Sequence, residues 1–158
     1  MQEASRNKHL LIMAVLILVL APVVFSQLYG WFLARQASGY LAAVNTRWQL
    51  ELPMTIDRVL YAADNDGEHC YILTFDESLS GQPWEFVNAE KARASAAGLM
   101  AAQKMPARWQ PDNASLLPVR IMTRTKAPDR SLYLIYFDRL FLAGSSYRHV
   151  LYLVEDES

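Results

Sequence analysis

The sequence predicts an α+β protein in which one N-terminal transmembrane helix precedes a small antiparallel β-sheet domain with one packed helix. Three observations predict this class. An uncharged apolar stretch lies near the N-terminus, several β-rich segments separated by turn residues follow it, and an alanine-rich segment lies between the second and third of them. The predicted order after the transmembrane helix is β-β-α-β-β-β. A length of 158 residues suits one modest domain plus an appendage.

The apolar stretch covers residues 10–34 and contains no charged side chain. A transmembrane helix needs about 20 apolar residues, whereas the core of a cleaved export signal has only about 7 to 15. Features of an export signal are nevertheless present. Arg6 and Lys8 precede the stretch, Pro22 interrupts it, and the small residue Ser26 offers a cleavage position. The stretch is therefore either a permanent anchor or a cleaved signal.

We favour the anchor because the chain stays apolar after Ser26. Aromatic residues followed by a charge have the order that is typical of a helix leaving the bilayer. A proline inside the bilayer kinks a helix without ending it, because neighbouring groups bond to the freed carbonyl. The residues expected to mark the anchor are Leu10, Pro22, Tyr29, Trp31 and Arg35.

The orientation follows from the charges that flank the stretch. Lys and Arg are almost equally numerous on the two sides, and the positively charged α-amino group favours a cytoplasmic N-terminus. The expected localisation is the cell (inner) membrane, single-pass, with the main domain extracytoplasmic, which means periplasmic in a bacterium.

Beyond the bilayer, residues 36–49 are expected to continue the helix as a stalk, with a possible bend at Gly39 and a stop at Pro53. The predicted organisation is an N-terminal flank at 1–9, a transmembrane helix at 10–34, a stalk or linker helix at 35–53 and an extramembrane α+β domain at 54–158.

The extramembrane domain opens with two β-rich runs joined by an Asn-Asp-Gly turn, which indicates a hairpin. A loop at 76–83 and an alanine-rich helix at 89–104, ended by Pro106, follow. The predicted strands are 58–64, 68–75, 117–125, 131–137 and 147–154.

Two segments of these strands, 70–75 and 132–137, are apolar on both faces. A strand of this kind needs cover on both sides of its sheet. The predicted helix covers one side. Either the stalk and the loops at Trp84 and Trp109 cover the other, or a partner protein does so through aromatic residues of the kind that interfaces favour. The candidate partner surface consists of Tyr133, Tyr136, Phe141, Tyr147 and Tyr152.

No arrangement of residues predicts a bound metal or cofactor. The Asp-x-Asp-Gly sequence that starts at Asp64 resembles the beginning of a calcium loop, but the twelfth position is Phe75, where an EF-hand needs Glu. A tight hairpin turn explains the same residues. Cys70 is the only cysteine, so the chain forms no intrachain disulfide and no thiolate zinc site of its own.

No sequence motif predicts a reaction either. The residue types of a hydrolytic triad occur near one another towards the C-terminus, but such types occur together by chance in most chains. They are Asp138, Ser145, Ser146 and His149. A net charge of -1 argues against a nucleic-acid partner, because phosphates are bound by clustered Lys and Arg.

We therefore expect a non-enzymatic, membrane-anchored accessory or scaffolding subunit. Its expected partners are the lipid bilayer and other membrane or envelope proteins, a second copy of the chain included. A ligand-sensing or solute-binding head that signals through the membrane helix is the alternative, and an envelope hydrolase is the third possibility. The sensing alternative requires a concave pocket over the aromatic strands.

Overall fold

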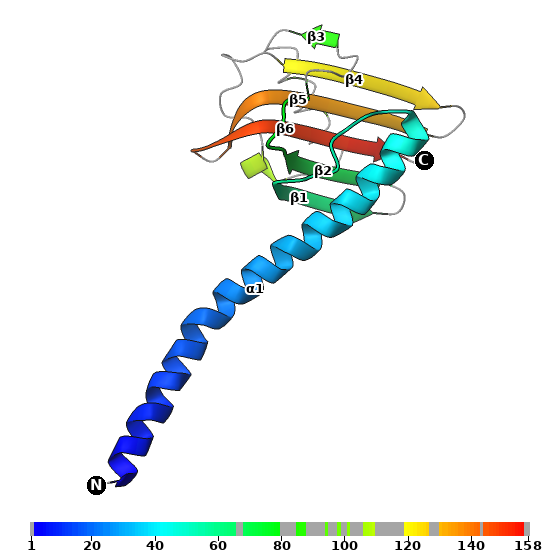
Figure 1. Cartoon of the computed structure of the whole chain (residues 1–158). Helices are drawn as coiled ribbons and strands as arrows, with labels where there is room; N and C mark the ends of the chain where they lie inside the picture. Colours follow the sequence, from blue (N-terminus) through cyan, green and yellow to red (C-terminus); the bar gives the residue numbers. More distant parts are fainter. Residues whose placement is uncertain are drawn as a thin grey trace.

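The computed structural model describes residues 2–65, 68–79, 85–87, 94, 98, 101, 106–109, 119–126, 130–142 and 144–156. They form a long helix and a six-stranded antiparallel sheet of strand order β1-β2-β6-β5-β4-β3 (Figure 1). The elements are α1 (Gln2–Trp48), β1 (Arg58–Asn65), β2 (Glu68–Thr74), β3 (Glu85–Val87), the short 3-10 helix η1 (Ala107–Trp109), β4 (Val119–Lys126), β5 (Arg130–Leu142) and β6 (Ser145–Asp156). The α+β class is confirmed.

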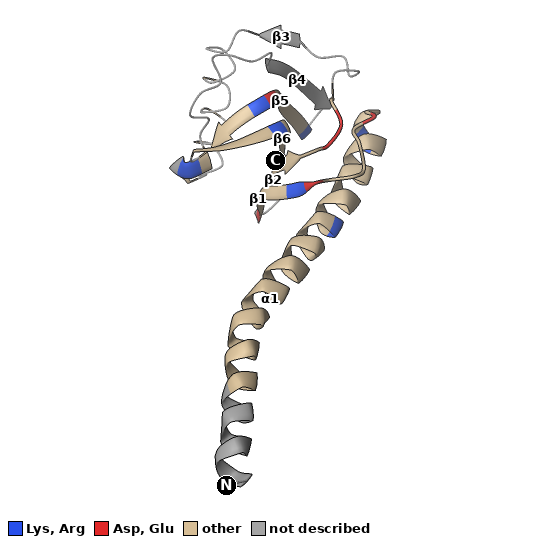
Figure 2. Cartoon of the chain, turned by 60° about the vertical axis from the view of Figure 1, so that its left-hand side comes forward, with Lys and Arg blue, Asp and Glu red and all other residues tan. Residues whose placement is uncertain are grey.

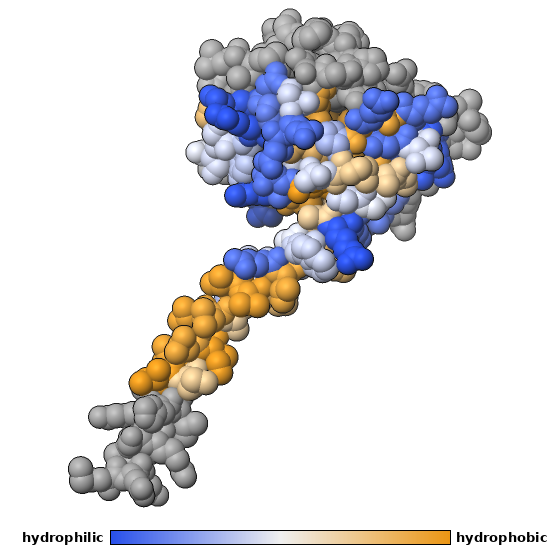
Figure 3. All heavy atoms as spheres, in the orientation of Figure 1, coloured by the Kyte–Doolittle hydropathy of each residue, from blue (hydrophilic) through white to orange (hydrophobic). Residues whose placement is uncertain are grey.

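The predicted transmembrane segment and stalk are one continuous helix. α1 has 47 residues and continues through both Pro22 and Gly39, so the bend expected at Gly39 does not end the helix. At 1.5 Å per residue its length is about 70 Å. The part from Ile12 to Trp48 is long and apolar enough to cross a membrane. Its large apolar side chains up to Phe32 are exposed, and Figure 3 shows this part of α1 as an apolar rod below a more polar head.

α1 ends at Trp48, five residues before the predicted stop at Pro53. Gln49 has a left-handed backbone with a φ of 55°, and the N–H of Leu50 donates to the carbonyl of Asn45 at 3.0 Å. This is the hydrogen bond of a Schellman-type helix end. The Asn45 side chain then binds the main chain of Leu52 twice, donating to its carbonyl at 2.8 Å and accepting from its N–H at 3.0 Å. The chain therefore turns back along α1 directly after the helix.

All five predicted strands are present, and β3 is an additional strand of three residues that pairs with β4. β5 and β6 extend further than predicted and form a long hairpin around Gly144, which has a φ of 80°. The helix predicted at 89–104 falls almost entirely outside the described residues, of which only Ala94, Gly98 and Ala101 belong to it; all three are helical and exposed.

The C-terminal third of α1 covers one face of the sheet. Ala37, Leu41, Val44 and Trp48 recur at helical spacing and are buried. They belong to one apolar cluster with residues of β2, β5 and β6, namely Tyr71, Leu73, Leu132, Leu134, Tyr136, Leu151 and Leu153. Figure 2 shows α1 alongside the sheet with few charged residues on its described part. The stalk thus provides the cover that was expected from either the stalk or a partner.

A second apolar cluster occupies the opposite face of the sheet. It contains Ile72, Ile135, Val150 and Tyr152, all nearly inaccessible to solvent, and Trp109 of η1 packs against it. The hydroxyl of Tyr152 donates to the carbonyl of Trp109 at 2.8 Å. Cover by the Trp109 segment therefore agrees with the sequence interpretation, whereas Trp84 lies outside the described residues. The two clusters explain why β2 and β5 are apolar on both sides.

Candidate functional site

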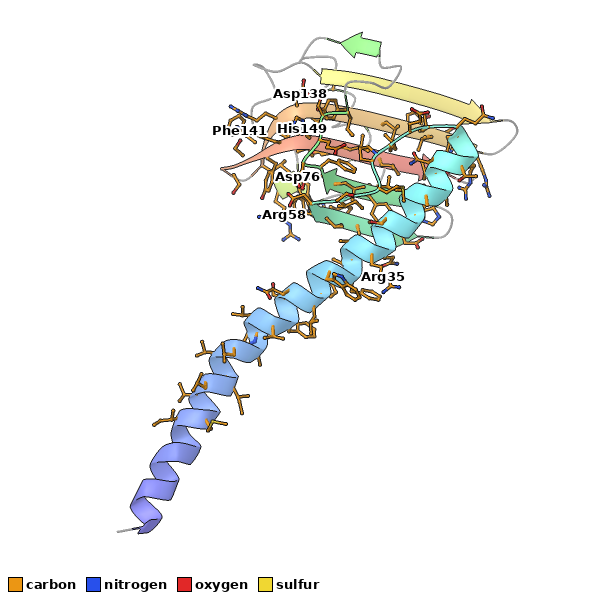
Figure 4. The ribbon with its side chains drawn as sticks, viewed as in Figure 1. Arg35, Arg58, Asp76, Asp138, Phe141 and His149 are labelled. Atoms are coloured by element: carbon orange, nitrogen blue, oxygen red, sulfur yellow. The ribbon has the colours of Figure 1, made fainter. Side chains whose placement is uncertain are left out.

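The residues expected to mark the anchor lie along α1. Tyr29 and Trp31 are more than half exposed, and the guanidinium of Arg35 lies over the Trp31 ring at 5.5 Å (Figure 4). Pro22 is inside the helix, and Leu10 belongs to its backbone. Ala37, two residues beyond Arg35, is already buried in the head. The head therefore begins within one turn of Arg35 and about two turns after the aromatic residues.

The five aromatic residues of the candidate partner surface do not form one surface. Tyr136 and Tyr152 are 0% and 1% exposed and belong to the two opposite clusters, so a partner would have to open the fold to reach either of them. Tyr133, Phe141 and Tyr147 are half-buried and accessible. Burial assigns Tyr136 and Tyr152 to the core, and only the other three are available for contact.

The junction between α1 and the sheet contains a buried carboxylate that the sequence analysis missed. The side chain of Glu155, near the end of β6, is 0% exposed. It accepts hydrogen bonds from three residues of α1: from the Tyr40 hydroxyl at 2.5 Å, from Arg47 Nη1 at 2.7 Å and from Trp48 Nε1 at 2.6 Å. We call these four residues the Glu155 site. A buried charge is costly unless it is paired and hydrogen-bonded, and here both conditions are met.

The pKa values of the Glu155 site follow from this arrangement. Burial alone raises the pKa of Glu155, but the hydrogen bonds from Tyr40, Trp48 and Arg47 outweigh burial and lower the pKa below its ordinary value. Burial, together with the hydrogen bond to Glu155, holds the pKa of Tyr40 well above its ordinary value. Glu155 is therefore ionised and Tyr40 neutral at neutral pH. The site fastens α1 to β6 and shows no group free for chemistry.

A second polar cluster lies on the same face of the sheet, towards its other end. The Tyr136 hydroxyl donates to Asp138 Oδ1 and lies 2.8 Å from His149 Nδ1 and 3.3 Å from Ser78 Oγ. Because a phenol has one proton and Asp138 receives it, Tyr136 accepts from both His149 and Ser78. Burial and the bond to Asp138 raise the pKa of Tyr136 to about 12.

His149 interrupts the pairing of β5 with β6. The register runs from Phe137 opposite Val150 to Arg139 opposite Arg148 and omits the pair between them. His149 has a φ of 50°, which is uncommon for a residue other than glycine. Its carbonyl accepts from the N–H of Phe75 at 3.1 Å. The backbone of His149 is thus turned towards the end of β2.

A groove of about 320 Å³ lies beside this interruption. Three segments line it, residues 57–58, 74–76 and 146–149. Figure 4 shows Arg58, Asp76 and His149 at the same end of the sheet, away from Arg35. Asp57 accepts from the Thr74 hydroxyl at 3.1 Å, which holds the start of β1 against the end of β2. We call this feature the β6 groove.

The structure brings together only part of the residue set of a triad. Asp138 and His149 are close, with Oδ1 and Nδ1 4.0 Å apart, but Tyr136 lies within hydrogen-bond distance of both. Ser146 lines the same groove as His149, whereas Ser145 does not. The described residues include no group of three or more His, Cys, Asp or Glu side chains arranged to hold a metal ion. Cys70 is buried, and burial raises the pKa of its thiol to about 12.

Comparisons with protein-family models, with curated proteins and with solved structures find no match for this chain.

Proposed function

We propose that the chain is a single-pass, membrane-anchored, non-enzymatic accessory or scaffolding subunit whose head docks to other membrane or envelope proteins. One observation carries the proposal: the apolar helix and the helix that covers the head are the same element, α1. The Glu155 site and the Asn45 hydrogen bonds fasten that element to the head. A head held in this way has a fixed height and rotation above a bilayer, which favours docking to neighbours in the same membrane.

The course of α1 supports a permanent anchor over a cleaved signal. Cleavage after Ser26 would leave a helix from Gln27 to Trp48 whose first turns carry Leu28, Trp31 and Phe32, each about 60% exposed. These side chains make no contact with the head that would shield them in water. In a bilayer the same side chains face lipid, and Trp31 with Arg35 lies at the height of the head groups. We place the N-terminus in the cytoplasm and the head on the extracytoplasmic side of the cell (inner) membrane.

A ligand-sensing head is the second candidate, and the β6 groove is the observation that favours it. The groove is polar, and His149 beside it has a strained backbone of the kind that is common at binding sites. A sensor must change the relation between head and membrane helix when its ligand binds. The Glu155 site opposes such a change, so we rank docking first.

The test uses the helical phase of α1. Tagged full-length protein is extracted in mild detergent, and the co-purifying proteins are quantified for the wild type and for two insertions between Arg35 and Gln36. Two alanines rotate the head by about 200° and raise it by about 3 Å, whereas four alanines rotate it by about 40° and raise it by about 6 Å. We expect a stoichiometric set of membrane proteins with the wild type, loss of that set with two alanines, and substantial retention with four.

A wild-type chain that purifies as a lone monomer contradicts the proposal. Equal retention of the partners by both insertions would show that the orientation of the head is irrelevant to docking. That result contradicts the role assigned to α1.

A further inference from the structure

The β5–β6 hairpin extends beyond β2, the strand that pairs with the other edge of β6. β6 pairs with β2 from Asp156 to Val150, which lies opposite Thr74, the last residue of β2. Its pairing with β5 continues past the interruption to Ser145 opposite Leu142. Among the described strands, none pairs with residues 145–148 of β6 on the side where β2 has ended. Figure 1 shows this end of the hairpin projecting beyond β1 and β2.

The main-chain groups of this free edge point outwards at two residues. Leu142 and Ser145 flank a two-residue loop, which makes them a hydrogen-bonded pair of the antiparallel ladder. The direction of the N–H and C=O groups alternates along a strand, so those of Ser146 and Arg148 point away from β5. Both side chains are exposed. The edge therefore offers two donors and two acceptors in extended geometry.

The β6 groove runs along this edge. One wall consists of residues 146–149 of β6, and residues 57–58 and 74–76 form the opposite side. The N–H of Phe75 donates to the carbonyl of His149 at 3.1 Å, which joins the two sides of the groove directly after the last paired residue of β2. The groove thus lies alongside β6 directly beyond the position where its pairing with β2 ends.

We propose that the β6 groove binds an extended segment of a partner protein, which adds to the sheet as a strand along Ser146 and Arg148, in line with β2. Strand addition to a free edge takes its affinity from main-chain hydrogen bonds and its specificity from the side chains nearby. The site rests on the proposed docking function and names the surface through which docking occurs.

A single strand fits this site better than the edge of a second copy. Pairing of two β6 edges would bring the whole β5–β6 hairpin of the other copy into the space beyond Ser146 and Arg148. Residues 57–58 and 74–76 already bound that space. Four exposed charged side chains line the groove, two acidic and two basic, so the site is suited to a segment without strong net charge. They are Asp57, Asp76, Arg58 and Arg148.

The experiment uses the full-length chain in lipid nanodiscs and a phage library of random 12-residue peptides. Peptides enriched over empty nanodiscs are synthesised, and their Kd is measured with the wild type, Ser146→Pro and Ser146→Ala. Proline removes the outward N–H, whereas alanine removes only the side-chain hydroxyl. We expect Ser146→Ala to bind within about twofold of the wild type and Ser146→Pro to bind at least about tenfold more weakly.

Hydrogen exchange of the wild type gives a second readout that does not depend on the folding of a variant. Bound peptide is expected to slow exchange of the Ser146 and Arg148 amides. The proposal is overturned by the absence of enriched peptides, by equal losses of affinity in the two variants, by protection confined to another surface, or by a dimer of the chain that Ser146→Pro dissociates.

Co-purification distinguishes strand addition from the proposed docking function. Partners retained by Ser146→Pro refute strand addition and leave the docking function intact, whereas peptide binding by a chain that purifies without partners refutes the docking function alone.

Discussion

Replacement of Glu155 by alanine tests whether the Glu155 site holds α1 to the sheet. The substitution removes the acceptor of three hydrogen bonds, two to Oε1 and one to Oε2. Trp48 Nε1 is buried with its acceptor, and the hydroxyl of Tyr40 is partly buried. The side chain of Arg47 is 28% exposed, so its guanidinium keeps access to water. The loss therefore falls mainly on the indole and the phenol.

The magnitude follows from these three environments. A buried donor left without an acceptor costs about 1 to 3 kcal/mol, so the indole and the phenol together cost about 2 to 6 kcal/mol. We expect Glu155→Ala to lower the free energy of unfolding of the head by this amount. For a domain of this size, 1 kcal/mol shifts Tm by roughly 4 to 8 °C, so Tm should fall by roughly 8 °C or more.

Thermal unfolding of the full-length chain in detergent, followed by near-ultraviolet circular dichroism, measures this loss. Glu77→Ala is the matched control, because Glu77 is an exposed carboxylate, and its removal should change stability by less than about 0.5 kcal/mol. A loss below about 1 kcal/mol for Glu155→Ala would refute the inference that this carboxylate fastens α1 to β6.

Three further predictions concern the same junction and the core. The pKa of Glu155 is lowered in the folded state, so its stabilising contribution is present above the unfolded pKa of about 4.3 and is lost as the pH falls through the folded pKa. Glutamine does not titrate, so thermal melts should show a smaller fall in the stability of Glu155→Gln than in that of the wild type between about pH 5 and pH 3. Asn45→Ala should cost about 1 to 3 kcal/mol in urea unfolding, because both main-chain groups of Leu52 lose their partner, whereas Thr46→Ala on the same helix should cost under about 0.5 kcal/mol. Maleimide should label Cys70 at least about a hundredfold more slowly in the folded protein than in urea at pH 8, because burial raises its thiol pKa to about 12 and blocks access; comparable rates would contradict its place in the core.

The fold was predictable where a local pattern determined the structure. The apolar run of α1 and the Asn-Asp-Gly hairpin both follow from local sequence. The end of α1 was placed wrongly because Gln49, which is not a glycine, adopts the left-handed conformation. Hydrogen bonds from the Leu50 N–H to the Asn45 carbonyl and between the Asn45 side chain and Leu52 stabilise this end. β5 was predicted to end at Phe137, directly before Asp138 and Arg139 interrupt its apolar run. The strand continues because pairing with β6 resumes on the far side of His149.

The candidate site was less predictable than the fold. Glu155 follows Leu151 and Leu153 with the period of a strand, so its position on the helix-facing side of β6 was available from the sequence. Its three donors lie more than 100 positions away on α1, and no local pattern links them to it.

The position of the aromatic residues in core or surface could not be predicted from local sequence either. Tyr136 and Tyr152 have the composition of a contact surface but pack in the core, because an aromatic strand residue suits both environments.

β6 connects the two features on which the proposed docking function rests. Near its C-terminal end, Glu155 is fastened to α1, and near its N-terminal end, Ser146 and Arg148 border the β6 groove. Glu155 lies nine positions after Ser146 along the strand, a distance of about 30 Å at the rise of an antiparallel strand. The groove therefore lies to the side of α1 rather than on its axis, where the proposed partner has room. A flexible tether would lose conformational freedom when a partner binds, and that loss opposes association. Under the proposed docking function, α1 loses that freedom when the head folds, so a segment that enters the groove meets an edge whose height and direction above the bilayer are already fixed.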